Sequence, residues 1–283
     1  MSVGVTGPAT IRVSDHLSLR LYPDSRPHLL ENATLQKGLV LVFDGEELVE
    51  EGMGLGTPVV RYSNDIYFSS SAHTFVEHGD GANQVLKKSF LIDSVSRKRI
   101  WNGPFINARI YDVLHLAFAR AYISKGHPNR FLTKLVKIRR SLGIRTQFVQ
   151  TQSKGKVTIS YRRFPNVIQV RADLSELHKP GCEEILIMNE AGSTFFTKYT
   201  DRNGLELVND EIGAWNKVEA TEASLSDFSG TLLFSLKKTE GADLYRGWER
   251  VKGRLSWAGL SYSMKAWKPV FEYYIRIQSD KYG

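Results

Sequence analysis

The sequence contains no Asp or Glu between Asp112 and Asp173, although thirteen of its 38 Lys and Arg residues fall in that interval. Subtracting those thirteen from 38 leaves 25 basic residues in the rest of the chain, against 30 acidic ones. The positive charge therefore belongs to one contiguous stretch, and the remainder is mildly acidic. A local excess of this kind produces a surface potential that attracts anions, so it constrains the partners of the protein.

Cysteine and long apolar runs are also scarce. Cys182 is the only cysteine, which excludes an internal disulfide and any metal centre built from several cysteines. No apolar run approaches the roughly 18 residues that a membrane-spanning helix needs. Residues 1–15 have neither a charged start nor an apolar stretch, so they do not resemble a signal peptide. We predict a cytoplasmic protein without a membrane span.

Motifs for a bound nucleotide, redox cofactor or metal are missing as well. Residues 52–58 hold three alternate glycines, but their spacing fits neither the dinucleotide fingerprint nor a P-loop. His73 and His78 would point to opposite faces of a strand, which separates their imidazoles. We therefore predict no cofactor and a metal-independent protein. The glycine stretch is either a strand connection or bulge, or a loop that brings backbone N–H groups, with Arg61 and Tyr62, to the rim of a pocket.

The sequence does have many short β-prone runs bounded by turn residues. Ser63-Asn64-Asp65 has the composition of a hairpin turn, and residues 85–92 and 95–101 are predicted as two further strands. A Ser-Lys-Gly turn between residues 147–152 and 156–163 predicts another hairpin. Many short strands with frequent turns are typical of a mainly β fold, an antiparallel β-sandwich or barrel-like body.

The hydrophobic period changes from two to 3.6 at residue 106. From there to residue 125, apolar residues recur at helical spacing, and Gly126 and Pro128 follow as stop signals. A second apolar stripe predicts a helix over residues 129–142, so an inserted αα-hairpin is expected at about 106–142. The chain then divides into an N-terminal β-rich part (1–105), a basic helical hairpin (106–145) and a C-terminal β-rich part (146–283), packed as one compact two-part body.

Two segments of the C-terminal part carry candidate site residues. Asn189 and Glu190 follow an apolar run just before a glycine, and polar residues at a strand end often line a cleft. The alternative is a simple turn after a buried strand. In a strand over residues 244–250, Tyr245 and Glu249 share one face with Gly247, a composition suited to stacking against a sugar ring and bonding its hydroxyls.

The basic stretch permits several interpretations. The second predicted helix carries four cations opposite its apolar stripe: Arg130, Lys134, Lys137 and Arg140. With Arg162 and Arg163 on a predicted strand, they could follow a nucleic-acid backbone. They could equally surround a cleft for a small or polymeric anion, or form a solvated face without a partner.

We interpret the chain as a β-sandwich protein that binds an anionic or polar carbohydrate-like ligand in a cleft. If it is an enzyme, acid/base chemistry by a lyase, isomerase or hydrolase is expected, with Glu249 and Glu190 as acid and base. The predicted ligand-binding residues are Arg246 and Arg61 for anionic groups, Tyr245, Trp257 and Tyr62 as platforms, and Asn189. Two other hypotheses stay open: a nucleic-acid-binding module using residues 120–171, and an enzyme or carrier that encloses a largely apolar ligand.

Overall fold

The computed structural model describes residues 2–4, 7–23, 26–28, 33–49, 52–63, 65–77, 84–100, 144–165, 167–251, 255–266 and 268–279. The first strands are β1 (Ser2–Gly4), β2 (Ala9–Arg12), β3 (Leu17–Leu21), β4 (Arg26–His28), β5 (Ala33–Leu35), β6 (Val40–Phe43), β7 (Glu46–Glu47), β8 (Gly54–Tyr62), β9 (Asp65–Glu77) and β10 (Val85–Ile100).

After residue 143 the described elements are again strands, apart from the 3-10 helix η1 (Asn209–Ile212). They are β11 (Ile144–Gln150), β12 (Lys156–Phe164), β13 (Val167–Asp173), β14 (Cys182–Ala191), β15 (Lys198–Asp201), β16 (Glu206–Val208), β17 (Asn216–Lys217), β18 (Glu222–Ser226), β19 (Leu232–Lys237), β20 (Asp243–Val251), β21 (Leu255–Met264) and β22 (Val270–Ser279). The predicted mainly β class is confirmed.

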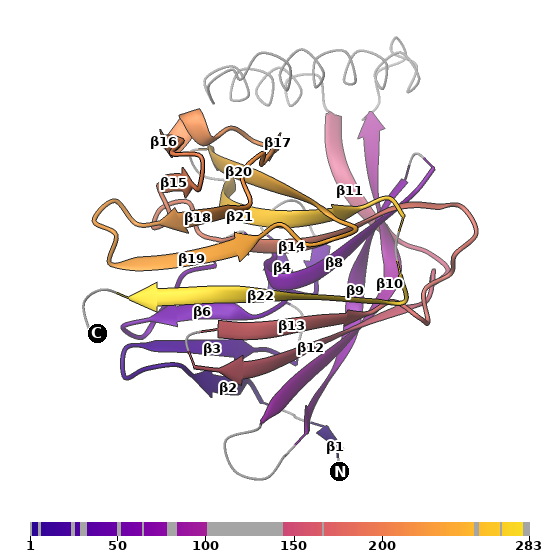
Figure 1. Ribbon diagram of the computed structural model, residues 1–283. Coiled ribbons are helices and arrows are strands. Elements are labelled where there is room, and N and C mark those ends of the chain that lie inside the picture. The colour runs from indigo at the N-terminus through magenta and orange to yellow at the C-terminus, as the bar shows by residue number, and fades with distance from the viewer. Residues whose placement is uncertain are drawn as a thin grey trace.

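Most strands belong to one large antiparallel sheet (Figure 1). Its order is β16-β15-β18-β19-β22-β13-β12-β10-β9-β8-β14-β21-β20-β17, with β1 added to β9 and β11 added to β10. Two smaller sheets, β2-β3-β6-β7 and β4-β5, are built from the N-terminal strands. Strands from both ends of the chain therefore hydrogen-bond within a single sheet.

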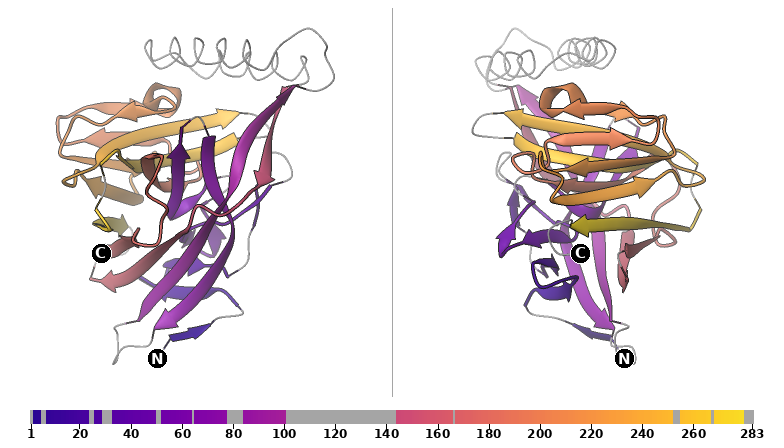
Figure 2. Two further views of the ribbon diagram at one scale, coloured as in Figure 1. Left: turned by 90° about the vertical axis from the view of Figure 1, so that its right-hand side faces the viewer. Right: turned by 60° about the vertical axis from the view of Figure 1, so that its left-hand side comes forward.

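The large sheet folds back on itself, so that two of its stretches face each other. The Tyr161 hydroxyl on β12 donates a 2.9 Å hydrogen bond to the Leu55 carbonyl on β8, although β10 and β9 lie between these strands in the sheet order. The rings of Tyr262 on β21 and Tyr273 on β22 lie 4.7 Å apart, across the same interior. One layer thus holds β18, β19, β22, β13 and β12, and the other β8, β14, β21 and β20, which is consistent with a β-sandwich (Figure 2).

The core lies between these layers because the strands alternate apolar and polar residues. In β12, Val157, Ile159 and Tyr161 are buried, and the residues between them are more exposed. In β22, Tyr273 and Ile275 are buried in the same way. Period-two alternation turns every second side chain to one face of a sheet, and the buried set here forms one continuous cluster. The small sheet β2-β3-β6-β7 contributes its own buried leucines to that cluster.

The predicted hairpin turn at residues 63–65 is confirmed, since Tyr62 and Asp65 are register partners at the β8–β9 connection. The prediction of two strands over 85–92 and 95–101 is wrong, because β10 is a single strand with an irregularity between Leu91 and Ser94. At that irregularity the buried carboxylate of Asp93 accepts hydrogen bonds from the backbone N–H and the hydroxyl of Ser70 on β9. The pairing of β10 with β9 therefore continues past the irregularity.

The predicted hairpin between residues 147–152 and 156–163 is also wrong. β11 and β12 do not pair with each other; each pairs with a different half of β10. The Ile92 N–H donates to the Gly155 carbonyl at 2.9 Å, and the Lys154 N–H donates to the Ile92 carbonyl at 2.7 Å. Residues 151–155 therefore bulge out between two strand segments that follow each other along one edge of β10.

The predicted helices at 106–125 and 129–142 lie outside the described residues, and so does most of the predicted 106–145 part. Within the residues that are described, no helix is long and apolar enough to cross a membrane.

Candidate active site

A row of three glycines and one glutamate crosses four neighbouring strands of the large sheet. Gly54 on β8 is the register partner of Glu190 on β14. Glu190 pairs in turn with Gly259 on β21, which pairs with Gly247 on β20. Register partners in an antiparallel sheet point to the same face. Glu190 is therefore the sole side chain that this row of four places on that face.

The glycines leave room for their neighbours. A Cβ atom on Gly259 would lie 2.9 Å from Cγ of Glu190, and one on Gly247 would lie 2.3 Å from the ring of Trp257. Glu190 therefore extends over the bare backbone of β21, and Trp257 extends over that of β20. Each glycine thus positions a side chain that the sequence analysis singled out.

Glu190 is buried, with 6% of its surface exposed. The backbone N–H of Met53 donates to its Oε2 at 2.8 Å, at the point where the chain enters β8 through Gly54 with a φ of +78°. Burial raises the pKa of Glu190 to about 7; the Met53 hydrogen bond and the charge of Lys37 oppose that rise, and the charge of Glu249 adds to it. Both protonation states of Glu190 are therefore populated near neutral pH.

Glu249 lies on the same face as Gly247 and is half-buried. Its register partner Trp257 donates the indole Nε1–H to Glu249 Oε2 at 3.0 Å. Burial raises the pKa of the Glu249 carboxyl, and the hydrogen bond from Trp257 opposes the rise. Strand β21 lies between β14 and β20, and the registers place Glu190 and Glu249 two strands apart on the same face. At that separation the charge of Glu249 adds to the rise in the pKa of Glu190, so joint ionisation is disfavoured.

The same face of β20 and β21 carries half-buried aromatic side chains. Tyr245 stands two residues before Gly247 and so shares its face, and Trp257 covers Gly247 itself. Trp215 stacks on Tyr245 with ring centroids 5.0 Å apart and planes 12° apart. The sequence analysis missed Trp215, because its place depends on the pairing of the two-residue strand β17 with β20, which no local pattern indicates.

Arg246 points away from this surface. It follows Tyr245 in β20, so the alternation of the strand turns it to the opposite face. There its Nε donates to the Ile212 carbonyl at 3.1 Å, and its guanidinium lies 4.8 Å from the centre of the Tyr199 ring. The structure does not bring this predicted anion-binding residue together with Glu249.

Arg61 and Tyr62 lie at the other end of the β8–β14 ladder. Arg61 forms an ion pair of 2.9 Å with Glu184, which precedes Glu190 by six residues, or about 20 Å of extended strand. The Tyr62 hydroxyl donates to the His178 carbonyl at 2.5 Å. These two residues do not join the paired carboxyl groups.

Asn189 faces the interior, opposite to Glu190, and is fully buried. Its Oδ1 accepts hydrogen bonds from the Gly56 N–H at 3.0 Å and from the Tyr273 hydroxyl at 2.6 Å. The glycine stretch 52–58 therefore directs two backbone N–H groups at side chains of β14, one of them Glu190. The glycine stretch contributes to the site because its Met53 N–H holds Glu190. Asn189 connects the two layers in the interior through its bond from Tyr273.

The predicted nucleic-acid surface is only partly described. Arg130, Lys134, Lys137 and Arg140 lie outside the described residues. Arg162 and Arg163 are exposed; Arg163 donates to the Val13 carbonyl at 3.1 Å, and Arg162 lies 5.6 Å from the centre of the Phe164 ring. Both contacts are with the protein itself and point to no nucleic acid. Across the described ranges, no three His, Cys, Asp or Glu side chains are grouped as metal ligands would be.

No protein-family model and no curated protein matches the sequence. Among solved structures, alpha-N-acetylgalactosaminidase NagBb from Bifidobacterium bifidum, in complex with GalNAc, matches 95% of this chain with 5% identity and a TM-score of 0.47. This chain covers 35% of that enzyme, about a third of its length. A galactose mutarotase-like protein from Lactobacillus casei ATCC 334 matches 96% of this chain and 99% of its own, with 9% identity and a TM-score of 0.43. A protein from Synechocystis sp. PCC 6803 matches 96% of both chains, with 8% identity and a TM-score of 0.37. Likeness at this level says nothing about activity.

Proposed function

We propose that the protein binds a carbohydrate-like ligand against the aromatic face of β20 and β21, and that Glu249 and Glu190 exchange protons with it. The observation that carries the proposal is that two carboxyl groups, one buried and one half-buried, lie two strands apart on the face that also carries Tyr245 and Trp257. Two titratable groups in unequal environments are the arrangement that acid/base chemistry uses.

Glu249 is the group that touches the ligand in this proposal. It is the more accessible carboxyl group, and the Trp257 N–H fixes one of its oxygens, while no donor among the described residues bonds to the other. Glu190 is too deeply buried to meet a ligand directly, and it acts through Glu249. When Glu190 holds its proton, Glu249 ionises more readily, because joint ionisation is disfavoured.

The surroundings favour a neutral, hydroxyl-rich ring over an anion. Trp215, Tyr245 and Trp257 offer aromatic faces that stack on the C–H side of a pyranose. Arg246 and Arg61, the two predicted anion-binding residues, have other partners at other places. Proton transfer at a sugar carbon or hydroxyl, as in an isomerase, lyase or hydrolase, is the reaction class that fits.

The test uses the full chain, a panel of neutral monosaccharides and aryl glycosides, and NMR detection of both binding and turnover. Glu249→Gln keeps the shape and the acceptor for Trp257 but removes the charge, so turnover should fall by at least about a hundredfold with little change in affinity. Trp257→Phe should weaken binding. Glu46→Gln, which changes an exposed glutamate on β7 of the small sheet, is the matched control.

Two results would contradict the proposal. Turnover by Glu249→Gln equal to that of the unmodified protein would remove the acid/base role. Binding that is unchanged by both Trp257→Phe and Tyr245→Ala would show that the aromatic face is not where the ligand lies.

A further inference from the structure

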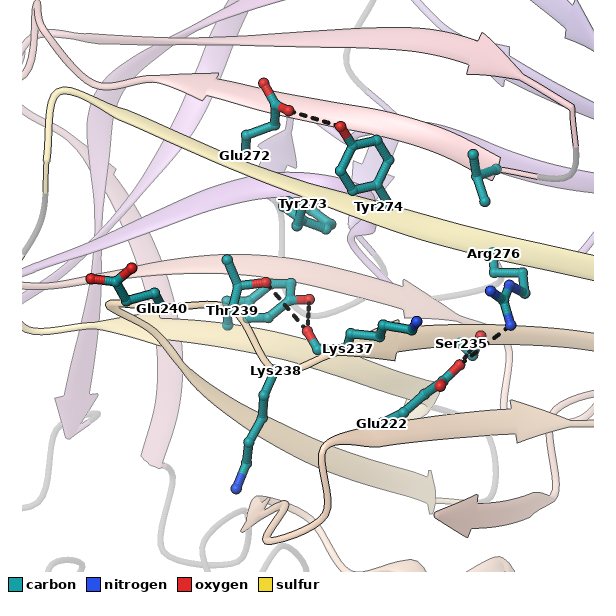
Figure 3. Close-up of a pocket in the computed structure, with 12 residues that line it drawn as sticks. Glu222, Ser235, Lys237, Lys238, Thr239, Glu240, Glu272, Tyr273, Tyr274 and Arg276 are labelled. Carbon is teal, nitrogen blue, oxygen red and sulfur yellow. Dashed lines mark hydrogen bonds and ion pairs between the residues drawn. The ribbon is translucent and has the colours of Figure 1, made fainter. Parts of the chain in front are cut away.

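A cleft opens in the other layer, where β19 and β22 diverge. Their pairing ends at Leu236 and Ile275, and beyond that point the two strands separate (Figure 3). The opening has a volume of about 590 Å³, within the range of small-molecule sites. The buried rings of Tyr262 and Tyr273 line it, and polar side chains of the outer face surround it.

One end of the cleft is cationic. Arg276 on β22 lies 3.7 Å from the carboxylate of Glu222, within ion-pair range but too far for a hydrogen bond. Glu222 is mostly buried and is held more closely by Arg202, at 3.2 Å. Among the described residues, no acceptor takes a hydrogen bond from the Arg276 side chain, so its N–H donors remain available to a ligand.

Lys237 adds a second cation at the same end. It lies on β19 one residue past the end of the pairing with β22, and its register partner on β18 is Glu222, which also lines the cleft. Lys237 is exposed, and within the described part of the chain no carboxylate lies at ion-pair distance from its ammonium group. Since Arg202 also pairs with Glu222, three cations share one carboxylate at this end, and the remaining positive charge suits the carboxylate of a ligand.

An aromatic ring occupies the middle of the cleft. Tyr274 is 50% exposed and stands on β22 between Glu272 and Arg276 (Figure 3). Its hydroxyl donates to Glu272 Oε1 at 3.1 Å, and Gln169 donates to the same oxygen at 2.8 Å. These bonds hold the ring in one orientation while leaving its face open. A ring fixed in this way can stack on the C–H face of a sugar at little entropic cost.

The other end of the cleft is acidic. Glu272, Glu240 and Thr239 line it, and the ammonium of Lys238, which also lines the cleft, donates to the Glu219 carbonyl at 2.6 Å. Carboxylates accept hydrogen bonds from sugar hydroxyls but repel further negative charge. A polyanion that spans the cleft is therefore disfavoured, whereas a ligand with one anionic group at the cationic end is matched.

We propose that this cleft is a binding site for an acidic sugar with one carboxylate, such as a uronic acid. The carboxylate of the ligand contacts Lys237 and Arg276 on the open side of Glu222, the ring stacks on Tyr274, and the hydroxyls bond to Glu272 and Thr239. This site is separate from the paired carboxyl groups of β14 and β20. Uronate binding in this cleft does not depend on whether those carboxyl groups are catalytic.

The experiment is a calorimetric titration of the full chain with galacturonate and with glucuronate. Their methyl esters, which keep the ring and lose the charge, and an amino acid, which is zwitterionic, are titrated in parallel. One uronate should bind, and its ester should bind at least about tenfold more weakly, the effect of one charge-assisted contact. Equal binding of acid and ester, or preference for the amino acid, would overturn the proposal.

Substitutions of the lining residues test whether uronate binds in this cleft. Arg276→Gln and Lys237→Gln should each weaken uronate binding by about tenfold, and Tyr274→Ala should weaken acid and ester alike. Arg12→Gln is the matched control, because Arg12 is an exposed arginine on the small sheet that does not line the cleft. Lys237 is exposed, so its variant tests the site even if Arg276→Gln folds poorly. Uronate binding that survives both charge variants would refute the site, and Glu249→Gln should leave that binding unchanged.

Discussion

The Tyr273 hydroxyl on β22 donates a 2.6 Å hydrogen bond to Oδ1 of Asn189 on β14 and thereby joins the two layers of the sandwich. The same oxygen accepts the Gly56 N–H at 3.0 Å, so one side chain connects three strands. Asn189 immediately precedes Glu190. The interior bond therefore fixes the backbone from which the buried carboxyl group extends to the opposite face.

Removing the Tyr273 hydroxyl tests this connection. Tyr273→Phe should lower the free energy of unfolding by about 1–2 kcal/mol, since Asn189 keeps its bond from Gly56. Asn189→Ala should cost more, because it leaves two buried donors without an acceptor. Urea unfolding measures both. Tyr274→Phe, which removes an exposed hydroxyl from the same strand, should change stability by less than about 0.5 kcal/mol. Equal losses for Tyr273→Phe and Tyr274→Phe would mean that the interior bond contributes little.

The raised pKa of Glu190 predicts a dependence of stability on pH. Its pKa rises from an ordinary value of 4.5 to about 7 in the folded protein, so the folded state binds more protons between these values. Stability contributed by protonated Glu190 is fully present below pH 4.5 and is lost as the pH rises to about 7. Glu190→Gln keeps an acceptor for Met53 and has no charge to bury.

The Gln variant should therefore gain stability relative to the unmodified protein as the pH rises through that window. The change should be on the order of 3 kcal/mol, at about 1.4 kcal/mol per pKa unit. Thermal unfolding of both proteins at pH 4, 5, 6, 7 and 8 measures it, with little further change expected between the last two values. Parallel curves across the whole range would contradict the raised pKa.

Gly259 should be intolerant of any side chain. A Cβ atom there would lie 2.8 Å from the Asn189 carbonyl oxygen, which is backbone and cannot move aside cheaply, and 2.9 Å from Cγ of Glu190. Gly259→Ala should destabilise the protein by about 1–3 kcal/mol and displace Glu190. Gly7→Ala is the control, because a Cβ atom at Gly7 would meet nothing within 4 Å. Similar stabilities for the two variants would show that the row of glycines is not needed for close packing.

Asp93 should be essential to the irregularity in β10. Its buried carboxylate accepts hydrogen bonds from the Ser70 N–H and the Ser70 hydroxyl, both at 2.9 Å. Asp93→Ala leaves these donors unsatisfied and should cost about 2–4 kcal/mol. Asp93→Asn retains the acceptor for the N–H, and the hydroxyl can turn to accept, so the loss should be much smaller. If Asp93→Asn lowered the free energy of unfolding as much as Asp93→Ala does, the charge of Asp93, and not its hydrogen bonds, would be the cause.

The sequence pattern predicts well which side chains share one face of a strand, but it predicts poorly which strands pair with each other. Alternation correctly placed Tyr245 and Glu249 on one face of β20, because that depends on a period of two alone. The approach of Glu249 to Glu190 depends on β21 lying between their strands, a long-range pairing without a local signature. The same limit explains Trp215, which reaches Tyr245 through β17, and the strand β10, whose partners change along its length.

At the end of the β10–β11 ladder, Ile100 and Ile144 are register partners. The chain thus leaves the sheet and re-enters it across a single rung, where partner Cα atoms lie about 5 Å apart. A two-residue turn would span the same gap, so the pairing of β10 with β11 sets no requirement on the length of the connection. Residues 101–143 connect these two partners in the sequence and contain seven of the thirteen cations of the basic stretch, Arg130 and Lys137 among them. More than half of that charge can therefore be changed without altering a residue of any described strand.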